Sequence, residues 1–133
     1  MTATNLTDLT VDSLTLGSTS LPYPASNTSQ LVVADGAITI KMGVVTLAKT
    51  VAGAMTITLA QPTATTDDWK VMSIISLQAQ ANTVAIAATG FGNGGANFIK
   101  ATFGGAIGDS MQVMAYQGFW YVIGLNNVTL GVA

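Results

Sequence analysis

Hydrophobic and polar residues alternate along most of the chain beyond residue 30. A period of two places successive side chains on opposite faces of an extended backbone, and threonine and β-branched residues favour such half-buried strands. Some segments are apolar almost throughout, which is typical of strands covered on both faces. The predicted strands are residues 37–41, 45–49, 55–59, 69–77, 84–87, 96–103, 111–116, 119–123 and 128–132.

Turn-forming residues separate these segments at short intervals. Glycine, proline and Asn or Asp pairs recur between the strands, and a short helical turn is predicted only near residues 63–68, after Pro62. Many short strands with this punctuation are typical of a β-sandwich or barrel. We therefore predict an all-β fold, a single compact β-barrel or jelly-roll-like sandwich over residues 31–133.

Residues 111–123 have the pattern of a β-hairpin with a tight turn at residues 117–118, Gln-Gly. On the second strand, Phe119 and Tyr121 share one face and Trp120 lies on the other. Core packing is the default interpretation of these rings and of those of Trp69 and Tyr116, and a carbohydrate-binding platform is the alternative. At least one face of the hairpin is expected to be core or subunit interface.

The first 16 residues follow a different pattern, with an aliphatic residue opening each group of five. The segment is polar and β-branched and has no core of its own, so only contact with another surface would order it. We predict an N-terminal arm over residues 1–16, followed by a linker over residues 17–30 that contains two prolines. A first strand of the domain is the alternative for this segment. The predicted contact residues, with a partner or with other copies of the chain, are Leu6, Leu9, Val11, Leu14 and Leu16.

The chain is poor in charge. Of 133 residues only 8% are charged, against about 25% in an average domain, and the net charge is −2. Weak charge repulsion favours a protein that covers much of its surface with other subunits; a monomer with a Ser, Thr, Asn and Gln surface is the alternative. Four scattered lysines do not form the cationic stripe that nucleic acids require. The sequence also predicts no signal peptide and no membrane span.

Chemistry-bearing side chains are scarce. The chain contains no His and no Cys, which removes imidazole and thiol catalysis and soft metal sites. The adjacent carboxylates of Asp67 and Asp68 are expected to cap an exposed turn rather than to act as an acid–base pair. Asp35 precedes a glycine and stands alone, which is typical of a hairpin turn rather than a calcium loop. We expect no enzyme activity, no metal and no cofactor.

Residues 90–95 form a glycine-rich run that is followed by a strand pattern, not by the helix of a phosphate-binding fingerprint. The run predicts a long loop between strands. Phe91 is expected to be exposed there, and Phe91 and Asn93 are candidate contact residues for a partner.

Several of these segments, taken in order, resemble small virion proteins of tailed bacteriophages. The resemblance covers about three-quarters of the chain and lies in residues 5–16, 37–49, 54–63, 103–115, 118–123 and 127–130. Among these virion proteins, the chain is most similar to capsid decoration (cement) proteins and head fibre proteins. It implies a location in the virion, on the phage head surface, a homotrimer, and the major capsid protein as partner, with no nucleic acid or membrane bound. Such a protein would stabilise contacts between capsid subunits. A head or tail fibre subunit that attaches to host surface glycans is the alternative, and a glycan-degrading enzyme a more distant one.

Overall fold

The computed structural model describes residues 14–16, 19–21, 28–86, 90–92 and 98–132. All regular secondary structure in these residues is β, and they contain no helix, so the all-β prediction is confirmed. The strands are β1 Leu14–Leu16, β2 Thr19–Leu21, β3 Ser29–Val32, β4 Gly36–Ile38, β5 Gly43–Leu47, β6 Thr56–Leu59, β7 Val71–Ser76, β8 Thr83–Ala85, β9 Lys100–Phe103, β10 Ser110–Tyr116, β11 Phe119–Asn126 and β12 Val128–Gly131.

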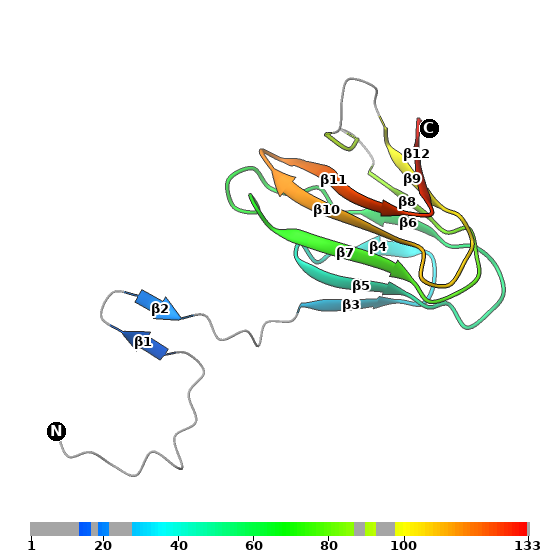
Figure 1. Cartoon of the computed structure of the whole chain (residues 1–133), viewed down its shortest axis with the longest axis horizontal. Coiled ribbons are helices and arrows are strands. Elements are labelled where there is room, and N and C mark those ends of the chain that lie inside the picture. Colours follow the sequence, from blue (N-terminus) through cyan, green and yellow to red (C-terminus); the bar gives the residue numbers. More distant parts are fainter. Residues whose placement is uncertain (1–13, 17–18, 22–27, 87–89, 93–97, 133) are drawn as a thin grey trace, which may run out of the picture.

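Two five-stranded mixed sheets pack face to face as a β-sandwich (Figure 1). The first sheet has the order β11-β10-β7-β5-β3, and the second has the order β12-β9-β8-β6-β4. The sheets do not close into a barrel, so the barrel prediction is not met.

The chain alternates between the sheets from β3 to β8, and each strand from β3 to β6 pairs in parallel with the strand two places later. This path resembles three successive coils of a solenoid. The later strands β9 to β12 complete both sheets with antiparallel pairs. A jelly roll is built from antiparallel strands, so the parallel pairs separate this fold from the jelly-roll prediction. The turn at Asp35 was expected to form a hairpin. It instead connects β3 and β4, which belong to different sheets.

The core fills the space between the sheets with the inward side chains of both. Burial alternates along the strands as the period of two predicts: in β6, Ile57 and Leu59 are buried while Thr56 and Thr58 are exposed. The largest fully buried side chain is that of Trp120, whose indole nitrogen donates a 2.9 Å hydrogen bond to the carbonyl of Ala60. A single hydrophobic cluster therefore joins the two sheets.

The β10–β11 hairpin confirms the predicted turn. Gln117 and Gly118 both have positive φ, 48° and 81°, as a two-residue hairpin turn with the twist of the flanking strands requires. Trp120 is buried and Phe119 is 37% exposed, so the predicted facing of the two rings is confirmed. A bulge between Gln112 and Val113 shifts the register farther along the hairpin.

Strands β1 and β2 form a separate two-stranded antiparallel sheet ahead of the sandwich (Figure 1). The sandwich begins with β3 at Ser29. The predicted linker, residues 17–30, thus contains β2 and the start of β3. Most of the predicted arm, residues 1–13, lies outside the described residues.

Candidate interaction surface

The outer face of the first sheet carries no charge. None of its five strands contains a charged residue, although many of its outward side chains are large. Exposed patches of this kind mark interaction sites more often than ordinary surface. Several large apolar or aromatic side chains on this face and at its margin are exposed, and we call six of them the apolar face: Leu31, Val44, Trp69, Val71, Tyr116 and Phe119.

The second sheet has a different outer face. Thr56, Thr83, Thr102 and Thr129 are consecutive cross-strand partners and form one row across four strands. Lys100, also outward on this sheet, is its one charged strand residue. Short hydroxyl-bearing side chains are readily solvated, so the apolar face of the first sheet is the stronger candidate for an interface.

The most exposed ring of the apolar face is held in place by its backbone. Trp69 is 66% exposed and has a φ of 70°, in the left-handed region that bulky residues rarely adopt. Its N–H donates a 2.7 Å hydrogen bond to the carbonyl of Ala115, and its ring lies 4.7 Å from that of Tyr116, tilted by 40°. Backbone strain of this kind clusters at functional sites. The indole is therefore presented to solvent in a fixed position, not folded into the core.

The loop before Trp69 is stabilised by the buried carboxylate of Asp67. It accepts hydrogen bonds of 2.7 Å from the Lys70 ammonium and from the backbone N–H of Thr63, and Lys41 lies 3.6 Å away. The Lys70 hydrogen bond, followed by the bond from Thr63, lowers the pKa of Asp67 to about 2. The turn was expected to be exposed, but the Asp67 side chain is only 7% exposed.

The neighbouring carboxylate ties the same loop to the hairpin turn. Asp68 accepts hydrogen bonds from both the backbone N–H and the side-chain amide of Gln117, at 2.7 and 2.9 Å. Both aspartates thus accept backbone N–H bonds, as the capping interpretation predicted. Together they hold Trp69 against Tyr116.

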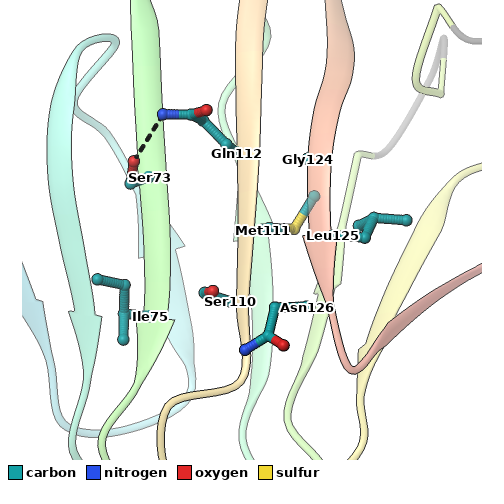
Figure 2. Close-up of a pocket in the computed structure, with 8 residues that line it drawn as sticks. All are labelled: Ser73, Ile75, Ser110, Met111, Gln112, Gly124, Leu125 and Asn126. Atoms are coloured by element: carbon teal, nitrogen blue, oxygen red, sulfur yellow. Dashed lines mark hydrogen bonds between the residues drawn. The ribbon is translucent and has the colours of Figure 1, made fainter.

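A shallow groove of about 360 Å³ lies on the same sheet, toward the opposite ends of β7 and β10 (Figure 2). Gly124 faces Gln112 across the ladder and leaves room that a side chain would fill. The Gln112 amide donates a 3.3 Å hydrogen bond to the Ser73 hydroxyl, as Figure 2 shows. No aromatic side chain lines the groove, in contrast to the aromatic end of the same sheet. Its lining residues are Ser73, Ile75, Ser110, Met111, Gln112, Gly124, Leu125 and Asn126.

The contact residues predicted from the sequence do not belong to the apolar face. Phe91 is only 4% exposed and belongs to the core, because its segment bridges to Trp120 along the edge of β11. Its predicted exposure is wrong. Asn93 lies outside the described residues. So do the predicted arm residues Leu6, Leu9 and Val11, whereas Leu14 and Leu16 lie in β1.

Polar groups that sequence analysis missed are buried between strands. Asn82 is fully buried; its side-chain oxygen accepts hydrogen bonds from the Met55 N–H and the Gln78 amide, and its nitrogen donates to Ser76. A single asparagine near a strand start carries no sequence signal that distinguishes this role from a turn.

The Asp109 carboxylate plays a similar structural part. It accepts backbone N–H bonds from Gly105 and Ala106 and an amide bond from Asn127, all 2.8 Å. These bonds, that from Ala106 foremost, lower its pKa. In the part of the chain that the structure describes, no three Asp residues gather as a metal site would require.

Comparison with known proteins adds little. No family model and no curated protein matches the chain. A solved structure described as "Structure of a chaperone-substrate complex" is similar to it with a TM-score of 0.45 and 18% identity, covering 74% of this chain and 18% of that chain. A likeness this weak carries no argument about function. Across the described ranges, no helix is long and apolar enough to cross a membrane.

Proposed function

We propose that this protein is a structural component of a larger protein assembly and that it attaches through the apolar face of its first sheet. The observation that carries the proposal is the combination of exposed Trp69, Tyr116 and Phe119 with a sheet free of charged residues. Tryptophan and tyrosine are enriched among the residues that dominate binding energy at protein interfaces, and charged residues are depleted at interface cores. A surface of this composition binds by shape and apolar contact.

The assembly we propose is the head of a tailed bacteriophage, with this protein as a capsid decoration (cement) protein. The sequence resemblance to virion proteins supports this choice, and the low charge of the chain agrees with it. In this function the apolar face binds the major capsid protein and stabilises contacts between neighbouring capsid subunits. A homotrimer would multiply modest single contacts by raising their effective concentration.

Binding to isolated phage heads tests this function. We expect the protein to co-sediment with heads that lack it and to raise the temperature at which they rupture. Val44→Lys places a charge on the apolar face and should abolish both effects. The matched control is Thr58→Lys, an exposed strand position on the outer face of the second sheet, which should bind normally. Equal binding by both variants would contradict attachment through the apolar face, and no binding by the unchanged protein would contradict the cement function.

A second candidate function is a head or tail fibre subunit that contacts host surface glycans. The observation that favours it is the pair formed by Trp69 and Tyr116, because an exposed indole can stack on the apolar face of a sugar ring. A head-binding assay separates the two functions when it is combined with phage adsorption. Loss of adsorption without loss of head stability in a Trp69→Ala phage would favour the fibre function.

A further inference from the structure

Strand β3 lies at one edge of the first sheet, and the described residues leave the outer side of this strand unpaired. The carbonyls of Thr28 and Val32 accept hydrogen bonds from the Val44 and Ala48 N–H groups, at 3.0 and 2.9 Å. Alternate residues of a parallel strand bond to opposite sides, so the backbone groups of Ser29 and Leu31 point away from β5. An open edge is a template for a further strand.

The neighbouring edge of β4 is closed by a side chain. The amide of Gln30 donates to the Ala37 carbonyl at 2.8 Å and accepts from the Thr39 N–H at 2.9 Å. The Ile38 carbonyl accepts from the N–H of Ala60, just after β6, so Ala37 of β4 and Thr39, which follows β4, face the free edge. The Gln30 amide thus takes the place of a neighbouring strand.

The edge strands on the other side of the two sheets, β11 and β12, also differ from β3. The edge of β11 is bent by its bulge and covered at Trp120, whose carbonyl accepts a 2.8 Å bond from the N–H of Gly92. The edge of β12 has no covering strand in the described ranges, but its outward residues Thr129 and Gly131 offer little apolar area. Leu31 of β3 is 63% exposed. Edges are normally blunted by charge, proline or a bulge, and β3 has none of these.

The chain itself carries a segment that needs such an edge. Strands β1 and β2 have three residues each and pair only with each other, and an isolated two-stranded hairpin is at best marginally stable in water. Both strands are uncharged and consist only of leucine, threonine and serine. In the single chain the hairpin joins neither five-stranded sheet, and seven residues separate it from β3, an arrangement suited to exchange between identical chains.

We propose that the β1–β2 hairpin of a second copy of this chain adds to the edge of β3 and extends the first sheet from five strands to seven. The backbone groups of Ser29 and Leu31 then pair with the incoming strand. This inference concerns association between copies and does not rest on the proposed attachment to a phage head.

Crosslinking between two differently labelled full-length chains tests this pairing. The chain has no cysteine, so Thr15→Cys or Ser20→Cys can be placed in one copy and Leu31→Cys in another, and a short bismaleimide added. We expect a crosslinked pair of the two labelled chains with at least one of the hairpin positions. Thr129→Cys, on the open edge of β12, is the control and should yield no such pair.

The other outcomes overturn the proposal. A double variant carrying Thr15→Cys and Leu31→Cys that links only within one chain would show that the hairpin folds back on its own edge. Crosslinking to position 129 would place the contact at β12, and no crosslink at either edge would exclude the exchange. Head binding is not part of this readout, so failure here leaves the proposed function intact.

Sedimentation equilibrium gives an independent measurement. Leu31→Lys places a charge on the edge and should shift the mass from an oligomer to a single chain. Thr129→Lys should leave the oligomer unchanged. A single-chain mass for the unchanged protein at high concentration would also overturn the inference.

Discussion

The left-handed backbone at Trp69 predicts an unusual order of stability between two variants. Trp69→Ala and Trp69→Gly remove the same ring and the same contact with Tyr116. They differ in the cost of a φ of 70°, which is roughly 1–2 kcal/mol for a residue with a Cβ and is absent for glycine. Glycine loses about 0.5–1 kcal/mol more chain entropy on folding than alanine. Trp69→Gly should therefore be more stable than Trp69→Ala, by about 0.5–1 kcal/mol.

Urea unfolding measures this difference directly. Either variant leaves Trp120 as the single tryptophan, and because it is fully buried its fluorescence reports on the core. The control is Val71, an exposed residue in the extended strand β7, where alanine should be more stable than glycine by about 0.5–1 kcal/mol. If glycine is the less stable residue at position 69 also, the left-handed backbone and the fixed presentation of the indole are both refuted.

Binding to heads should not follow that order. Both variants lack the exposed indole, so both should lose about 2 kcal/mol of binding free energy or more, which is roughly 30-fold in Kd. Equal losses in two variants of unequal stability would assign the effect to the ring itself. Binding that follows stability would assign it to the fold.

Further predictions concern the groups that hold the fold. Asp67 has a pKa of about 2 in the folded protein against an ordinary 3.8. Its stabilising effect is therefore complete above about pH 4 and is lost as the pH falls through 2. Asp67→Asn should lower the stability measured by urea unfolding at pH 7 and should flatten this dependence of stability on acid pH. Asn82→Ala leaves the buried Met55 N–H without its acceptor, which should cost about 1–3 kcal/mol in the same assay, whereas an unchanged midpoint would mean that water replaces the amide. Gly43→Ala should destabilise the pairing of β3 with β5, because a Cβ there would overlap the Thr28 carbonyl oxygen and φ is 102°; slower hydrogen exchange at Val44 would contradict this.

Local patterns predicted the strands of the sandwich other than β3 and, in several of them, which side chains face inward. The alternation in residues 55–59 predicted β6 and its buried face, because the period of two is a property of the extended backbone itself. The turn at residues 117–118 predicted the β10–β11 hairpin for a similar reason, since a two-residue turn fixes the pairing of the strands beside it. The facing of Trp120 followed from these two rules.

Only the tertiary structure decided which distant strands pair and what each surface became. Parallel pairing of β3 with β5 and of β4 with β6 depends on contacts between residues far apart in sequence, for which short segments carry no signal. The same packing buried Phe91, which neighbouring glycines had suggested was exposed, and exposed Trp69, which lies in an apolar segment. The sequence by itself determined a charge-poor chain of alternating strands. The arrangement of the strands decided which of its faces and edges stay open to other molecules, because exposure depends on what packs from elsewhere in the chain.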